Sequence, residues 1–285
     1  MSNAHVHLVG SGSHDTATPD VHTASPEYAA RFDGPVGEWM LNRQTSGLKD
    51  ILHYMAEQTE CARLRILDVG GGHGQLTRTF LDAGHDVVVQ GSSAVCFRHL
   101  RPAHPDLKSC VASSLWRLPF AEGSFDLVIG VRLLGHVRAW QALIAEMSRV
   151  SRRWVAVEFS RTHGIFDMGP LGRALFSLKR RIERTPRPFY SYSEKVVAEA
   201  MEECGLQVAR VDAQFVLPVF LHRACARPRV SAAIERALAR AGAGKRVRSP
   251  VLMLAEQGAM ACLKSPTRPV GASYSAEGEA SRIPV

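Results

Sequence analysis

The sequence predicts an α/β fold built on one mostly parallel sheet with helices on both of its faces. Short runs rich in Val, Ile and Leu alternate with amphipathic segments of helical length from residue 62 to residue 160. The runs are apolar throughout rather than at alternate positions. Strands with this pattern are buried on both faces, as in a parallel sheet covered by helices.

The elements follow one another with clear stop signals. Seven strands are expected, at 64–69, 86–90, 107–112, 125–131, 153–159, 206–216 and 250–255. Helices are expected at 76–83, 93–101, 140–150, 193–203 and 230–241. Helix-ending residues follow three of these helices, at Gly84, Pro102 and Gly205. The final strand is expected to be an antiparallel partner at the edge of the sheet.

The N-terminal region divides into two parts. Residues 1–24 are polar and rich in His, lack the apolar stretch of a secretory signal, and are expected to be disordered. Residues 25–60 are expected to form a helical cap, with Ser25 as its N-cap. Gly34 and Pro35 should break this cap, and a second helix should begin at Gly47.

The rest of the chain is assigned to one domain, 61–263, followed by a flexible tail at 264–285 that is rich in Ser, Pro and Gly. Residues 162–192 interrupt the strand–helix alternation. This segment is basic, contains two prolines and ends in aromatic residues, so it is interpreted as a lid inserted after the fifth strand.

Composition narrows the class of protein. The chain has 285 residues and 46% hydrophobic content, enough for one large domain with a lid. It has no run of 18 apolar residues, so no transmembrane helix is expected. Six cysteines occur without C-x-x-C spacing, which argues against a metal site and against a disulfide framework. Reduced thiols in a cytoplasmic protein are the simplest interpretation.

The chain is basic, with a net charge of +8 and a pI near 9.5. The basic residues concentrate at 173–187 and 223–248. Such surfaces attract nucleic acid, anionic lipid or an acidic small substrate, although solvated helix faces explain them equally well. The basic charge is therefore compatible with a small or amphipathic substrate and with peripheral contact with a membrane. The sequence does not define the oligomeric state.

The most informative segment is a glycine-rich turn after the first expected strand. Asp68 ends an apolar run, and Gly70, Gly72 and Gly74 follow before a helical pattern begins. Glycines in such a turn let a ligand lie directly against the backbone. The G-x-G-x-x-G spacing of a dinucleotide-binding turn is absent, because Gln75 stands where its last glycine would be. An NAD-dependent dehydrogenase is therefore a poor interpretation.

The pattern acid-x-G-x-G-x-G resembles the first motif of the class I S-adenosylmethionine (SAM) methyltransferases. A second segment, Leu118–Ile129, resembles the LPF-x-x-x-x-FD-hydrophobic segment of the same family. The similar segment is typical of the methyltransferase type 11 branch of that family, which includes the ubiquinone- and menaquinone-biosynthesis enzymes. Leu133–Val137 is similar to the L-E-H-V turn of that family. The resemblance covers 62–160 well and implies a Rossmann-like fold.

The resemblance also implies SAM as the cofactor, held beyond the carboxyl ends of the strands. Asp68 would orient the loop and favour the ammonium group of the cofactor, although it also suits a cap for loop amides. The implied cofactor-binding residues are Asp68, Gly70, Gly71, Gly72, Gly74, Gln90, Gly91, Ser92, Ser113, Ser114, Val131 and Arg132.

Two positions depart from the family pattern. Similar enzymes usually have an acid at the end of strand two, which binds both ribose hydroxyls, and this chain has Gly91 there. They often have an acid that binds the adenine amino group four residues before the LPF leucine, where this chain has Ser114. Losing a charge-assisted hydrogen bond weakens binding by about 1–2 kcal/mol.

Methyl transfer needs alignment, and a base where the acceptor is a hydroxyl or an amine. His136, after strand four, is the first candidate for this base, and His163, after strand five, is the second. A structural role is the alternative for each. The candidate acceptor-binding residues are aromatic and are Tyr28, Phe32, Tyr190 and Tyr192.

The leading hypothesis is SAM-dependent methylation of a small or lipid-like acceptor on oxygen, nitrogen or carbon. Gly91 and Ser114 keep open a non-catalytic protein with the same fold. The basic charge keeps RNA methylation open. Nucleic acid is not the expected partner, because the chain has no appended RNA-binding module and no N-P-P-[FYW] motif.

Overall fold

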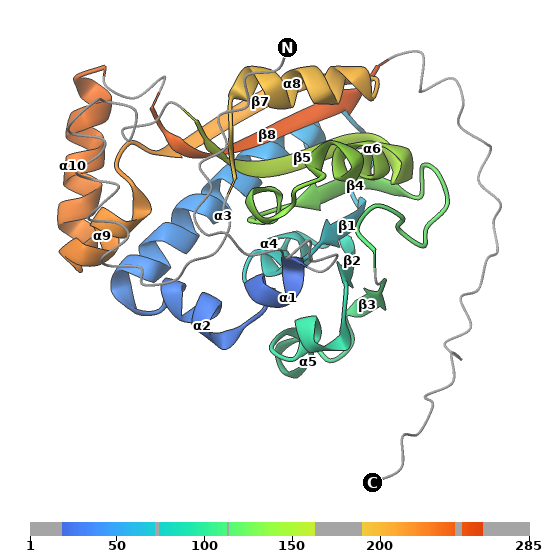
Figure 1. The fold of residues 1–285 in the computed structure, drawn as a ribbon, viewed down its shortest axis with the longest axis horizontal. Helices are drawn as coiled ribbons and strands as arrows, with labels where there is room; N and C mark the ends of the chain where they lie inside the picture. The colour runs from blue at the N-terminus through green and yellow to red at the C-terminus, as the bar shows by residue number, and fades with distance from the viewer. Residues whose placement is uncertain (1–18, 72–73, 113, 163–189, 243–246, 259–285) are drawn as a thin grey trace, which may run out of the picture.

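The computed structural model describes residues 19–71, 74–112, 114–162, 190–242 and 247–258. One mixed sheet with the order β3-β2-β1-β4-β5-β8-β7 forms its centre (Figure 1). Neighbours from β3 to β5 are parallel, whereas β8 is antiparallel to both β5 and β7. The strands are β1 Arg65–Val69, β2 Asp86–Gly91, β3 Lys108–Val111, β4 Phe125–Gly130, β5 Ser151–Arg161, β6 Ser191–Tyr192, β7 Leu206–Phe215 and β8 Ser249–Gln257.

Helices cover both faces of the sheet, each with its own core. The α-helices are α1 Pro19–Thr23, α2 Pro26–Ala29, α3 Gly34–Glu57, α4 Thr77–Asp82, α5 Leu100–Ala103, α6 Trp140–Val150, α8 Glu194–Glu203, α9 Val219–Cys225 and α10 Pro228–Arg240. Short 3₁₀ helices are η1 Ala30–Phe32, η2 Ala94–Phe97 and η3 Leu134–His136. Apolar residues of α6 and α8 pack on one face of the sheet, and those of α3 and α4 on the other. The predicted α/β class with a mostly parallel sheet is confirmed.

The sheet differs from the prediction at its antiparallel side. A seven-strand path is present, and the two-residue β6 additionally pairs with β5. The prediction that the final strand lies at the edge is wrong, because β8 lies between β5 and β7. Its central residues, Val251–Ala255, are at most 1% exposed, as suits an interior strand. The edge strand β7 instead exposes 41% of Val211.

The N-terminal region also differs from the prediction. The expected disorder through residue 24 is wrong for the last part of that segment, because Pro19–Thr23 form α1 and Asp20 is fully buried. The expected second helix does not begin at Gly47, since α3 runs unbroken from Gly34 to Glu57. Gly47 lies inside α3, and a side chain there would be too close to β7, because a Cβ on Gly47 would lie 2.5 Å from Asp212 Oδ2. The glycine marks close packing of α3 on β7.

Several predictions fall outside the described residues. These are most of the lid at 162–192, the tail at 264–285 and residues 1–18. Helix α9, which the sequence patterns did not indicate, precedes the basic helix α10. Among the described residues, no helix has the length and apolar character needed to cross a membrane.

Candidate cofactor and acceptor site

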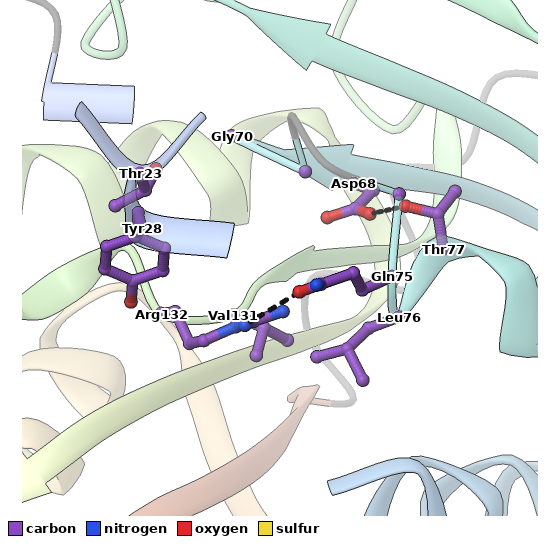
Figure 2. A pocket seen from close by; sticks show the side chains of 11 residues that line it. Thr23, Tyr28, Asp68, Gly70, Gln75, Leu76, Thr77, Val131 and Arg132 are labelled. Atoms are coloured by element: carbon purple, nitrogen blue, oxygen red, sulfur yellow. Dashed lines mark hydrogen bonds between the residues drawn. The ribbon is translucent and has the colours of Figure 1, made fainter. Parts of the chain in front are cut away.

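A small cavity lies where β1 and β4 end, at the point where the strand order reverses. Its volume is about 30 Å³. Figure 2 shows Thr23 and Tyr28 across this cavity from Asp68 and Thr77. The lining residues are Thr23, Tyr28, Asp68, Gly70, Gly71, Gly74, Gln75, Leu76, Thr77, Val131 and Arg132. Of the four strand ends at which cofactor-binding residues are predicted, the cavity is lined by two, the turn after β1 and residues 131–132 after β4.

The turn after β1 has a backbone that only small residues fit. Gly70 and Gly74 have φ values of +72° and +67°, which favour glycine. A Cβ on Gly71 would lie 2.3 Å from Asp68 Oδ2. The Gly70 amide donates to the carbonyl of Gln90 at 2.9 Å, which ties the turn to the end of β2. Gly72 lies outside the described residues.

Asp68 is a buried acid at the head of this turn. Its side chain is 5% exposed, and its Oδ2 accepts a 2.6 Å hydrogen bond from the Thr77 hydroxyl. Burial raises the pKa of the Asp68 carboxyl to about 6, while the Thr77 bond and the charge of Arg132 act in the opposite direction. A buried carboxylate of this kind gains most from a cation placed in the cavity.

Arg132 is fixed by contacts around its whole length. Its φ of 58° is in the left-handed region, and its amide donates to Glu158 Oε2 at 3.0 Å. Its guanidinium donates to Gln75 Oε1 at 3.2 Å (Figure 2) and lies 4.2 Å from the centre of the Phe32 ring. The left-handed backbone of a non-glycine residue is a strained feature that is common at functional sites.

Glu158 is a functional candidate that the sequence patterns did not reveal. It is 2% exposed on β5, and its Oε1 accepts from the side-chain amides of Gln44 and Gln214 at 2.8 and 3.2 Å. Burial raises its pKa, and the charge of Arg132 is the largest opposing influence. One signal was present in the sequence, since Glu158 is the single acid within the otherwise apolar run 154–159 of β5.

The end of β2 is occupied by contacts within the chain. Gln90 donates from its side chain to the carbonyl of Ala112 at 3.2 Å. The Ser92 amide and hydroxyl donate to the carboxylate of Asp20, a residue of α1 that no sequence motif indicates. The Ser114 hydroxyl accepts from the Trp116 amide at 3.2 Å. Ser113 lies outside the described residues.

The catalytic and acceptor candidates separate into two groups. His136 is partly exposed on η3, and its ring centre lies 6.2 Å from that of Tyr28, edge to face. Phe32 is buried beneath the guanidinium of Arg132. These three side chains therefore form one aromatic neighbourhood beside the cavity. His163 lies outside the described residues.

Tyr192 belongs instead to the core. It is 7% exposed, and its hydroxyl donates to the carbonyls of Leu134 and Val137 at 3.3 and 3.2 Å. Tyr190 packs against the same core and donates its amide to the carbonyl of Gly135 at 2.8 Å. Both tyrosines brace the η3 turn, and neither lines the cavity described above. Among the described residues, no group of His, Cys, Asp and Glu side chains is arranged to hold a metal ion.

Comparison with known proteins agrees with the motifs. Residues 67–154 match the family described as "Methyltransferase domain". Over 153 residues the chain is 39% identical to a demethylmenaquinone methyltransferase from Beutenbergia cavernae, a match covering 50% of this chain and 61% of the relative. A demethylmenaquinone methyltransferase from Renibacterium salmoninarum is 33% identical over 141 residues, covering 47% and 59%. The matches thus span less than two thirds of these relatives.

Solved structures extend the likeness to the whole fold. Magnesium protoporphyrin IX methyltransferase from Synechocystis, solved with SAM, aligns over 87% of this chain and 100% of its own, with a TM-score of 0.56 and 14% identity. A sarcosine dimethylglycine methyltransferase structure from Galdieria sulphuraria aligns over 76% and 86%, with a TM-score of 0.54 and 15% identity. The predicted methyltransferase domain is therefore confirmed over residues 67–154, and the solved structures agree with the predicted Rossmann-like fold.

Proposed function

We propose that this chain, which carries a SAM-dependent methyltransferase domain, is an enzyme that methylates a small or lipid-like acceptor. SAM supplies an activated methyl group on a sulfonium centre, so the protein has to align the two reactants and manage one proton. One observation carries the proposal: the buried Asp68 carboxylate faces a glycine-lined cavity at the switch point of the sheet.

In this proposal, the cofactor is held mainly by the segment Asp68–Thr77. Asp68 binds its ammonium group, and the backbone of Gly70, Gly71 and Gly74 lies against its amino-acid end. Thr77 holds the Asp68 carboxylate in place through the 2.6 Å hydrogen bond. Gly72 of the same turn is also a proposed contact. The remaining proposed contacts come from the ends of the neighbouring strands and are Gln90, Gly91, Ser92, Ser113, Ser114, Val131 and Arg132.

The acceptor side is proposed to lie at the aromatic neighbourhood of Tyr28, Phe32 and His136. His136 takes the acceptor proton on an imidazole nitrogen when the acceptor is a hydroxyl or an amine. Burial raises the pKa of Tyr28, so its hydroxyl stays a neutral hydrogen-bond donor. A flat aromatic acceptor fits such surroundings, and the quinone and porphyrin substrates in the names of similar proteins support that class.

Calorimetric titration with S-adenosylhomocysteine, the demethylated product of SAM, tests the cofactor assignment. We expect micromolar binding by the full chain and none with NAD. Asp68→Asn should weaken binding about 10-fold, because one charge-assisted contact is lost. Asp82→Asn is the matched control, since Asp82 is an exposed acid on the neighbouring helix α4. Absence of binding at millimolar ligand would favour the non-catalytic alternative.

The acceptor assignment needs an activity measurement. Radioactive methyl transfer from SAM is measured with a demethylated quinone, a porphyrin and a total RNA preparation. We expect transfer to one of the two flat aromatic acceptors, and His136→Gln should lower kcat with little effect on binding of S-adenosylhomocysteine. Transfer to RNA alone would contradict the proposed acceptor class.

A further inference from the structure

The end of β2 has no room for an acid of its own. Strand β2 ends at Gly91, and a Cβ there would lie 2.9 Å from both Cys96 Cβ and Phe97 Cζ. Cys96 and Phe97 are fully buried, so neither has space to withdraw. A carboxylate at this strand end therefore has to come from elsewhere in the chain.

Helix α1 brings a carboxylate to this place. Asp20 Oδ2 accepts a 2.6 Å hydrogen bond from the Ser92 amide, and Asp20 Oδ1 accepts a 2.5 Å hydrogen bond from the Ser92 hydroxyl. The Cys96 thiol approaches Oδ2 to 3.4 Å. A Cβ on Gly70 would lie 3.5 Å from the Asp20 Cβ, so Asp20 lies between the ends of β1 and β2.

The surroundings of Asp20 are unusual for an acid. The residue is fully buried, and the three donors named above are neutral groups. Burial, together with the neighbouring carboxylate, raises the pKa of the Cys96 thiol to about 11, so the thiol keeps its proton. Burying a carboxylate against neutral donors is costly compared with leaving it in water. A carboxylate also offers about four lone-pair sites, and these three contacts leave one for a further donor.

We propose that Asp20 supplies the carboxylate that binds the ribose hydroxyls of the cofactor, in place of the acid that β2 lacks. This inference rests on the proposed function. The ribose diol offers two O–H donors, and a carboxylate only accepts hydrogen bonds. One hydroxyl takes the remaining lone-pair site of Asp20, and the other replaces the Cys96 thiol, the weakest donor of the three. The bonds are charge-assisted, which makes them stronger than those that Gln90 or Ser92 alone provide.

The proposal requires α1 to move. The cavity beside the turn has a volume of about 30 Å³ and is lined on one side by Thr23 of the same helix (Figure 2). Such a space holds about two to three water molecules, far less than a nucleoside occupies. Helix α1, dark blue in Figure 1, must therefore lift to admit the cofactor and close again with Asp20 on the ribose.

Titrations of the full chain with S-adenosylhomocysteine and with its 2′-deoxy analogue test this role. For S-adenosylhomocysteine, we expect Asp20→Asn and Asp20→Ala to bind at least about 10-fold more weakly than the natural sequence. The loss should shrink with the deoxy analogue, because one of the bonded hydroxyls is missing. A merely structural role of Asp20 would weaken both ligands equally and would overturn the proposal.

The controls separate the remaining outcomes. Asp33→Asn should leave binding unchanged, since Asp33 is an exposed acid of the same region with no side-chain bond to the helix it precedes. Unchanged or tighter binding in the Asp20 variants contradicts the proposal. Tighter binding would mean that Asp20 holds α1 in a position that competes with the ribose. Failure of the natural sequence to bind overturns the proposed function as well, whereas binding that does not depend on Asp20 overturns this inference alone.

Discussion

The two neighbouring strand ends at the candidate site are built in different ways. At the end of β1, the acid, the glycines and the supporting hydroxyl all come from one stretch, Asp68–Thr77. At the end of β2, the acid comes from Asp20, which is 72 residues away from Ser92 in the sequence. The residues at the end of β1 are therefore close together in the sequence, whereas the end of β2 receives its acid only when α1 docks against it. A motif search therefore finds one end and reports the other as deficient.

The largest expected effect is at the local end. Gly71→Ala should weaken binding of S-adenosylhomocysteine about 100-fold, because the added Cβ would lie 2.3 Å from Asp68 Oδ2 and must displace that carboxylate. Gly130→Ala is the control, since the nearest atom to its Cβ is at an ordinary 3.6 Å. Equal binding by both variants in calorimetry would show that the turn does not hold the ligand.

The second prediction concerns a variant in which the end of β2 carries its own acid, as the end of β1 does. Placing an acid on β2 by Gly91→Asp should not restore binding to an Asp20→Asn chain. The new side chain would meet Cys96 and Phe97 at 2.9 Å and should destabilise the fold by about 1–3 kcal/mol through overpacking. Thermal unfolding measures the stability, and calorimetry measures the binding. Full restoration of affinity would mean that β2 tolerates a local acid after all.

The third prediction is a pH dependence that belongs to the β1 end. The folded-state pKa of Asp68 is raised from 3.8 to about 6, so binding of S-adenosylhomocysteine through its ammonium group should be roughly 10-fold weaker at pH 5 than at pH 7. In the ligand-free protein, the native state holds a proton that the unfolded chain releases. The contribution of Asp68 to stability therefore falls as the pH rises from about 4 to about 6.

Asp68→Asn separates these two consequences. The variant should lose the pH dependence of binding between pH 5 and pH 7, and it should also lose the Asp68 part of the stability change. Calorimetry and denaturant unfolding across this range provide the measurements. A pH dependence that survives in Asp68→Asn would have to be assigned to another group.

The smallest expected effects come from the groups that support each acid. Thr77→Val removes the hydroxyl that lowers the pKa of Asp68, so the midpoint of the binding-versus-pH curve should move upward. Ser92→Ala removes the hydroxyl bond to Asp20 but not the amide bond, so it should weaken binding only about 2- to 5-fold, without moving that midpoint. Identical changes in both variants would contradict the distinction between the two ends.

The sequence predicts secondary structure best where it depends on residues that are neighbours in the chain. Helix α6 has the bounds predicted for it, 140–150, because its apolar residues recur at helical spacing. The sequence misleads where a residue serves a distant partner. The pattern predicts a helix start at Gly47, but Gly47 is an interior residue of α3 that leaves room for Asp212 of β7. The sequence suggests Tyr192 for the acceptor pocket, whereas its hydroxyl bonds to the carbonyls of Leu134 and Val137 and supports that turn.

The parallel sheet, the glycine turn and the position of Asp68 can be predicted from the sequence, because a strand, a turn and a helix N-terminus are encoded by contiguous residues. The contact of Asp20 with Ser92 and the bond from the Arg132 amide to Glu158 arise only when distant segments pack together. These contacts join distant segments through single polar side chains, which leave no periodic pattern in the sequence. Their positions follow from how α1 and the strand ends pack together.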